Sequence, residues 1–175
     1  MKKRLLSKSK YMVGLQCPKY LWLVFNEPAK ISEPDAGTQY IFDEGHRLGE
    51  LAKKLFPNGV DIPSDDFIGN LSQTRELLKE NRPLFEPAFS VDSVYSRLDI
   101  LNPIGDGSWD IYEVKGSTSV KDENIHDVSF QRYCCQKAGL EIRKCFLVHV
   151  NNKYIRSADI EPEKLFTIEE ITDQV

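Results

Sequence analysis

The sequence has few cysteines, no long apolar run and no excess of positive charge, and each absence excludes a class of protein. None of its four cysteines forms a Cys-x-x-Cys pair, so neither a disulfide framework nor a complete zinc or iron–sulfur site is expected. They are Cys17, Cys134, Cys135 and Cys145. No stretch approaches the roughly 18 apolar residues of a membrane span. The formal net charge of -4 argues against nucleic-acid binding through global basicity.

The 175 residues are enough for one well-buried core, and no repeat or linker divides them. The basic N-terminus is followed by an apolar stretch, but Gln16, Pro18 and Lys19 interrupt it and no cleavage pattern follows, so we expect no signal peptide. These features predict a soluble, cytoplasmic protein with reduced cysteines, in which Cys17 is a small core residue.

Apolar periodicity and capping residues predict four helices in the first half of the chain. Ser7 or Ser9 is expected to cap the first helix, and a second begins after Pro18. Residues 39–55 form an amphipathic pattern, and residues 72–81 form a short capped helix.

The second half is rich in β-branched and aromatic residues, which predicts strands at 84–91, 93–101, 108–116 and 143–150. Between the last two lies a helix at 123–140, closed by Gly139. Asn151 and Asn152 suggest a hairpin, and Thr167 with Glu170 resembles a capping box that opens a final helix. That helix stops after a few residues, as in a frayed tail or a domain cut from a longer protein. The order of elements predicts an α/β fold with a mixed central β-sheet flanked by α-helices.

The stretch WDIYEVKGST places an acid and a base on one strand. Side chains alternate along a strand, so Glu113 and Lys115 share a face. The turn at 102–107 should fold the strand that carries Asp99 back against them. A solvated cross-strand ion pair is the simpler interpretation. Two neighbouring carboxylates, however, favour Mg²⁺ or Mn²⁺ between them, and the ammonium suits a phosphoryl group, which indicates phosphodiester hydrolysis.

The Arg-Leu-Asp and Glu-Val-Lys segments together resemble the PD-(D/E)xK nuclease superfamily. The resemblance extends to its RecB-like branch, which includes the CRISPR-associated exonucleases. That branch has a serine-rich opening with a Cys-Pro pair, matched by SKSKYMVGLQCP, and a Gly-x-x-x-His or similar element, matched by His46. A glutamine on the helix after the motif is matched by Gln131. The usual proline before the aspartate is Leu98 here, and Cys135 stands where many relatives have tyrosine.

The resemblance implies a restriction-endonuclease-like core and a single nuclease domain over residues 1–175, or the N-terminal part of a longer protein. It implies that His46, Asp99, Glu113 and the Val114 carbonyl bind the metal, while Lys115 positions the attacking water and Gln131 orients Lys115 or the phosphate. Alternatively, His46 is a structural histidine, and Gln131 caps a turn or faces solvent. In the iron–sulfur subset of the branch three further cysteines follow the nuclease core. Cys17 matches the first ligand position, but Cys134, Cys135 and Cys145 precede that region and have the wrong spacing, so no cluster is expected within this chain. Further ligands beyond Val175, in a longer protein, are the alternative to a core role for Cys17.

Basic residues near the N-terminus are candidates for phosphate contacts, with solubility as the alternative role. They are Lys2, Lys3, Arg4, Lys8, Lys10 and Lys19. The expected partner is DNA, single-stranded or with ends, and the expected action is exonuclease-like; a downstream domain of the same protein is a further expected partner. One alternative is a catalytically inactive nuclease-fold module that binds nucleic acid or protein. Another is a metal-dependent phosphoesterase acting on nucleotides, which the absence of a Gly-rich phosphate loop disfavours.

Overall fold

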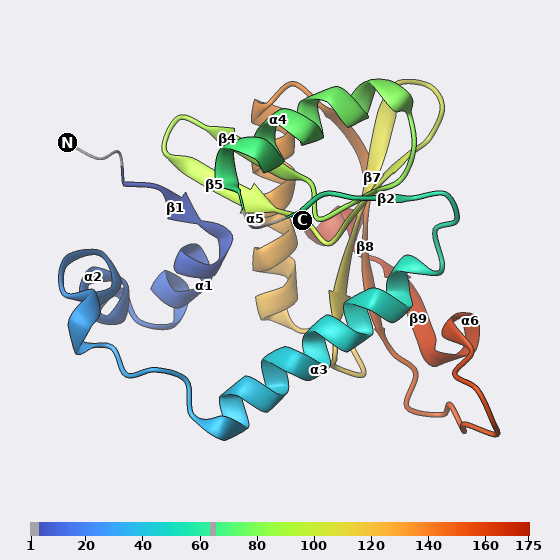
Figure 1. Cartoon of the computed structure of the whole chain (residues 1–175), viewed down its shortest axis with the longest axis horizontal. Helices are drawn as coiled ribbons and strands as arrows, with labels where there is room; N and C mark the ends of the chain where they lie inside the picture. The colour runs from blue at the N-terminus through green and yellow to red at the C-terminus, as the bar shows by residue number, and fades with distance from the viewer. Residues whose placement is uncertain (1–3, 64–65) are drawn as a thin grey trace.

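A computed structural model describes residues 4–63 and 66–175 as an α/β fold with mixed β-sheets flanked by helices (Figure 1). The larger sheet has the strand order β2-β3-β6-β7-β8-β9. Its strands are β2 (Val60–Asp61), β3 (Leu84–Phe85), β6 (Ile100–Pro103), β7 (Ser108–Lys115), β8 (Glu141–Val150) and β9 (Phe166–Glu170). Strand β7 is antiparallel to β6 and parallel to β8, so it lies at the centre of the sheet.

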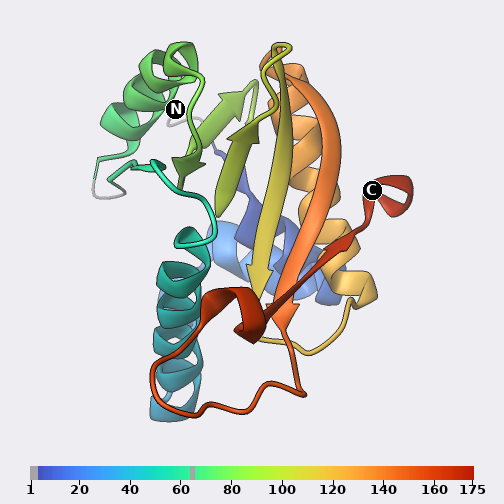
Figure 2. The ribbon, with the colours of Figure 1, turned by 90° about the vertical axis from the view of Figure 1, so that its right-hand side faces the viewer.

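Helices cover both faces of this sheet, with α5 (Asp122–Lys137) on one side and α3 (Ala36–Lys53) on the other (Figure 2). On the α5 side, Ile111 of β7 and Val128 of the helix belong to one buried cluster. On the α3 side, Ala52 of the helix is buried with Ile100 and Val148. Burial of both faces accounts for the nearly continuous apolar runs of the central strands.

A second sheet, of order β1-β5-β4, comes from strands that the sequence predicted to be continuous. Each of the predicted strands 84–91 and 93–101 is broken in two, giving β3 and β4 (Ala88–Val91) from one and β5 (Val94–Arg97) and β6 from the other. The break falls at Glu86, whose φ is +59°, and at Pro87, which has no N–H. Opposite it, Leu98 donates its N–H to the Pro87 carbonyl (2.9 Å). The resulting bend places Asp99 just before β6. β1 (Leu6–Ser7) completes this sheet.

The predicted helices of the first half are present, with starts set by their capping residues. α1 (Lys8–Gln16) is capped by Ser7, whose hydroxyl accepts the Lys10 N–H (3.3 Å), and α2 (Pro18–Asn26) begins at its proline. α3 starts before residue 39, because Asp35 accepts the Thr38 N–H (2.8 Å). α4 (Phe67–Leu77) starts before residue 72, because Asp66 is its cap. Short 3₁₀ helices η1 (Pro28–Lys30) and η2 (Leu78–Glu80) follow α2 and α4.

The helix predicted at 123–140 is α5, and Gly139 ends it with a φ of +92°. Helix α1 packs against α5, and the rings of Tyr11 and Phe130 stack with centroids 4.8 Å apart. This contact brings the amino end of α1 to the same side of the sheet as α5. Lys8, the first residue of α1, therefore lies close to Glu113 near the carboxyl end of β7, although 105 residues separate them in sequence.

Two predictions for the C-terminal region are wrong. The hairpin expected at Asn151 is absent, because the Asn151 side chain accepts the Lys153 N–H and donates to the Lys164 carbonyl, and α6 (Pro162–Leu165) intervenes. The capping box expected at Thr167 and Glu170 lies instead in strand β9, which pairs antiparallel with β8. The Glu170 carboxylate accepts a hydrogen bond from the Lys144 ammonium (2.7 Å). Only the 3₁₀ helix η3 (Thr172–Gln174) follows β9.

All four cysteines are free thiols, as predicted. Cys134, Cys135 and Cys145 are buried, but Cys17 is exposed at the junction of α1 and α2, so its prediction as a core residue is wrong. The neighbouring residues from Leu15 to Tyr20 are exposed as well, so the whole junction lies at the surface. Within residues 4–63 and 66–175, no helix has the length and apolar character needed to cross a membrane.

Candidate active site

The carboxyl end of β7 carries the predicted acid and base on one face. The Lys115 ammonium donates to Glu113 Oε1 (2.5 Å). Glu113 is only 1% exposed, which excludes the interpretation of these residues as a solvated surface pair. The Lys115 side chain remains 29% exposed, so its ammonium reaches from the buried carboxylate towards solvent.

Helix α5 adds two polar side chains that lie one turn apart on its buried face. Gln131 donates through Nε2 to Glu113 Oε2 (2.6 Å) and to Asp127 Oδ1 (2.9 Å). Asp127 also accepts the Lys115 ammonium through Oδ2 (2.7 Å). Gln131 is fully buried, so it does not cap a turn at the surface. It holds the carboxylates of Glu113 and Asp127 in fixed positions beneath Lys115.

Asp99 reaches the same place from the bend before β6. Its Oδ2 accepts the Val114 N–H (2.7 Å), just beyond the last paired residues of the β6–β7 ladder, Ile100 and Tyr112. The carboxylate of Asp99 therefore lies beside the backbone that joins Glu113 to Lys115. The sequence correctly predicted that the turn at 102–107 would bring these three residues together.

Lys8, at the start of α1, also belongs to this cluster. Its ammonium lies 3.0 Å from Glu113 Oε1 and 3.5 Å from Asp127 Oδ1. The sequence offered Lys8 only as a phosphate contact, and its place among the carboxylates was not predicted. We call Lys8, Asp99, Glu113, Lys115, Asp127 and Gln131 the β7-end cluster.

The surrounding charges and burial shift the pKa values of the carboxylates in this cluster in different directions. Burial alone would raise the pKa of Glu113, but the ammonium groups of Lys115 and Lys8 hold it well below its usual value. Burial, and then the charge of Glu113, raises the pKa of Asp99 to about 7 and also raises that of Asp127.

The pKa values of the two lysines are raised, whereas that of Glu113 is lowered. Burial opposes their charge, yet the nearby carboxylates raise the pKa of both Lys8 and Lys115 above the ordinary value. Both side chains are therefore ammonium groups at neutral pH. Lys115 can donate hydrogen bonds to a water molecule or a phosphate oxygen, but it cannot accept a proton.

A cleft of about 1270 Å³ opens over the cluster. Its walls include Lys8, Asp99, Glu113, Lys115 and, on α3, the exposed His46. His46 thus faces the same cleft as the predicted metal ligands, and its role as a ligand stays a prediction. Asp127 and Gln131 lie behind this surface and do not line the cleft.

Two other acidic residues in the lining of the cleft have partners of their own. Glu86 accepts a hydrogen bond from Arg97 Nε (2.7 Å), and Glu50 accepts one from the Lys53 ammonium (2.5 Å). Both line the cleft. They are bound to neighbouring bases and do not join the β7-end cluster.

The oxygen atoms at the end of β7 are of the type that hard divalent ions bind. In the part of the chain that the structure describes, no three His, Cys, Asp or Glu side chains form a ready-made metal site. Asp99 and Glu113 nevertheless both line an open cleft, and Asp99 accepts the N–H of Val114, the residue that follows Glu113. Two carboxylates with a backbone carbonyl are the protein share of many Mg²⁺ sites, since the ion keeps several waters and takes the rest from a phosphate.

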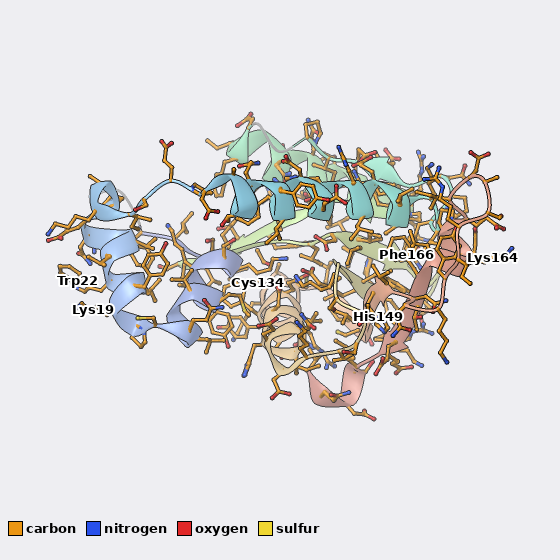
Figure 3. The ribbon with its side chains drawn as sticks, turned by 90° about the horizontal axis from the view of Figure 1, so that it is seen from below. Lys19, Trp22, Cys134, His149, Lys164 and Phe166 are labelled. Atoms are coloured by element: carbon orange, nitrogen blue, oxygen red, sulfur yellow. The ribbon has the colours of Figure 1, made fainter. Side chains whose placement is uncertain are left out.

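The other predicted phosphate contacts lie away from the cluster. The Lys10 ammonium lies over the ring of Phe25, 4.6 Å from its centroid. Lys19 is exposed on α2, near Trp22 and far from Phe166 at the opposite end of the molecule (Figure 3). Neither residue lines the cleft. Lys2 and Lys3 lie outside the described residues.

One residue of the cluster, Asp127, was missed although the sequence carried a signal for it. It lies four residues before Gln131, so both had to share a face of the predicted helix. No such periodicity links Lys8 to the cluster, because its position depends on the packing of α1 against α5.

Comparisons with known protein families and with curated proteins give no match to this sequence. The resemblance to the PD-(D/E)xK superfamily therefore stays a prediction, and the functional proposal rests on the residues of the cluster and the cleft above them.

Proposed function

We propose that this chain is a divalent-metal-dependent nuclease of PD-(D/E)xK type that hydrolyses phosphodiester bonds in DNA. The observation that carries the proposal is the position of Lys115. Its ammonium is fixed by Glu113 (2.5 Å) and Asp127 (2.7 Å) and faces an open cleft beside Asp99. A lysine held between carboxylates at such an edge suits the positioning of a nucleophilic water at a phosphate.

Lys115 acts by orientation and charge. Two of its three N–H groups are bonded to Glu113 and Asp127, so as an ammonium it has one left to donate, either to the attacking water or to a phosphate oxygen, where negative charge grows as the reaction proceeds. The water oxygen bonds to phosphorus while the bond to the leaving oxygen breaks, and the water loses a proton to solvent as the leaving oxygen gains one. The products are a phosphomonoester and a hydroxyl end.

Asp99 and Glu113, with the Val114 carbonyl, would hold a Mg²⁺ or Mn²⁺ ion. When bound, the ion supplies charge neutralisation at the scissile phosphate. Gln131 and Asp127 do not face the cleft, so their part is to hold Glu113 and Lys115 in place.

The shape and lining of the cleft favour a polymer as the substrate. The cleft is open to solvent, and its lining combines residues of α3 between Gln39 and Lys53 with four members of the cluster. Arg97 adds positive charge to the lining, where it pairs with Glu86. A chain of phosphates can follow such a surface, whereas a free nucleotide is usually held in an enclosed phosphate-binding loop.

A catalytically inactive nucleic-acid-binding module is the second candidate, and one observation favours it. Glu113 already accepts hydrogen bonds from Lys8, Lys115 and Gln131, so both of its oxygens are engaged by the protein. In such a module the lysines would be permanent counter-ions of the buried carboxylates.

The deciding experiment is cleavage of end-labelled single-stranded and double-stranded DNA at low salt, with Mn²⁺, Mg²⁺ or EDTA. We expect metal-dependent cleavage that Lys115→Met abolishes. Lys121→Met is the matched control, because it removes an equal charge from the same cleft but lies outside the cluster. Its activity should stay close to that of the wild type.

Absence of cleavage by the folded protein under all metal conditions would favour the binding module. Cleavage that survives Lys115→Met would remove the β7-end cluster from the reaction altogether.

A further inference from the structure

The hydrogen bonds of Glu113 leave no position for another ligand. A carboxylate offers about four lone-pair positions. Oε1 accepts from Lys8 (3.0 Å) and Lys115 (2.5 Å), and Oε2 accepts from Lys8 (3.3 Å) and Gln131 (2.6 Å). A metal ion that binds Glu113 must therefore displace one of these donors.

Lys8 is the donor that is held least tightly. Gln131 is fully buried and bound to two carboxylates, and Lys115 is anchored by Asp127 as well as by Glu113. The two contacts of Lys8 with Glu113 are longer than those of its competitors, and its contact with Asp127 is 3.5 Å. The Lys8 side chain is also 20% exposed, and it lines the cleft through which an ion would arrive.

Release of Lys8 requires no movement of the fold. Helix α1 stays fixed through the stacking of Tyr11 on Phe130, while the lysine side chain has four rotatable bonds. Its ammonium can leave Glu113 and Asp127 by rotation of the side chain into the cleft. We infer that Lys8 is an exchangeable internal cation, which occupies the carboxylates without metal and is displaced when a divalent ion binds.

This inference rests on the proposed function, since it concerns the metal that the nuclease would use. It also explains how a site can be active although both Glu113 oxygens accept hydrogen bonds from the protein: one donor, Lys8, leaves when the metal binds. Lys8 sets the metal concentration at which the site fills. Because the divalent ion must first displace the Lys8 ammonium, the apparent affinity of the site for the metal is lower than that of the same carboxylates without Lys8.

The first test measures Mn²⁺ binding by calorimetry, without DNA, for the wild type, Lys8→Met and Lys121→Met. Methionine keeps the length of the lysine stem but has no charge. We expect Lys8→Met to lower the Kd for Mn²⁺ by about tenfold, as for removal of a competing unit charge at contact distance. Lys121→Met removes the same charge from the cleft and should change the Kd much less.

The second test uses the wild-type chain alone, so it does not depend on the folding of a variant. Lysines are labelled briefly with an amine-reactive acetylating reagent, with and without Mg²⁺, and the modified sites are quantified by mass spectrometry. Displacement by the ion should increase the labelling of Lys8 several-fold. Lys10, on the same helix but against Phe25, should be labelled equally in both conditions.

The outcomes separate the two proposals. If the wild type binds Mn²⁺ and cleaves DNA, but Lys8→Met binds no more tightly and Mg²⁺ leaves Lys8 labelling unchanged, then Lys8 is a fixed support and the exchange is wrong. The nuclease proposal would survive that result. If neither the wild type nor Lys8→Met binds a divalent ion, both proposals fail.

Discussion

The two ends of strand β7 each bury one carboxylate, yet their surroundings differ. At the amino end, the Asp110 carboxylate accepts hydrogen bonds from Nε (3.0 Å) and Nη2 (2.5 Å) of Arg143. It also accepts one from the backbone N–H of Lys144, and both residues belong to the adjacent strand β8. At the carboxyl end, Glu113 is surrounded by groups from β7, α1 and α5. Both carboxylates are 1% exposed. Burial of an acid alone therefore does not mark a functional site.

The two ends differ in the balance of positive and negative charges around the carboxylate and in whether solvent can reach it. Asp110 has one matching guanidinium and does not line the cleft. The carboxyl end gathers three carboxylates and two ammonium groups under an open cleft. An uneven set of charges that faces solvent can accept a further ion or a phosphate, whereas a closed pair can only stabilise the fold.

The largest expected difference between the two ends is in catalysis. The proposed function predicts that Glu113→Gln reduces metal-dependent DNA cleavage by about 10³-fold or more, because it removes charge that would act directly at the reaction centre. Asp110→Asn changes the same chemical group on the same strand and should cleave DNA at close to the wild-type rate. Initial rates at saturating Mn²⁺, with circular dichroism to confirm folding, measure both. An equal loss in Asp110→Asn would contradict the functional contrast.

A smaller effect is expected from the residue that supports the carboxyl end from beneath. Gln131→Leu leaves Glu113 Oε2 and Asp127 Oδ1 without the amide donor, so kcat should fall by about 10–100-fold, the range for such supporting residues. KM for DNA should stay unchanged, because Gln131 does not line the cleft.

Ser96→Ala is the control for Gln131→Leu. The hydroxyl of Ser96 is also buried, but it has no hydrogen-bond partner among the described residues. Its removal should leave kcat unaltered. A rise in KM for Gln131→Leu with constant kcat would mean that Gln131 acts in DNA binding.

At the amino end the expected effect is on stability. Asp110→Ala removes the partner of Arg143 and leaves the Lys144 N–H without its acceptor, at a cost on the order of 2 kcal/mol in the free energy of unfolding. Urea unfolding measures the change. Glu76→Ala, which breaks an exposed ion pair with Lys79, should leave the midpoint unchanged. An unchanged midpoint in Asp110→Ala would show that the amino end is not a structural pair.

Local patterns in the sequence were sufficient for only part of the β7-end cluster. Alternation placed Glu113 and Lys115 together, a turn rich in glycine brought Asp99 back to them, and helical spacing could have added Asp127. Lys8 could not be found in this way. Its place depends on α1 packing against α5, which is a contact between distant segments and leaves no local periodicity.

The wrong predictions about the fold also arise because local sequence patterns do not report contacts between distant segments. The break at Glu86 and Pro87 divides strands whose composition is continuous, and the Asn151 side chain forms backbone hydrogen bonds that replace a hairpin. Composition predicts that a segment is extended, but it does not say to which sheet that segment belongs. The α/β class was predicted correctly, whereas the division into two sheets was not.

The smallest effect concerns the middle of β7, between its two charged ends. There Ile111 pairs with Cys145 of β8, and burial raises the pKa of Cys145 and of Cys134 on α5 to about 11. Because the thiolate is the reactive form, both should be inert at pH 8, as should the buried Cys135. Titration with a chromogenic disulfide should detect one fast thiol in the native protein, the exposed Cys17, and four in urea. A second fast thiol that disappears in Cys145→Ser would mean that solvent reaches the centre of the strand, and the two ends would no longer be separated by a dry core.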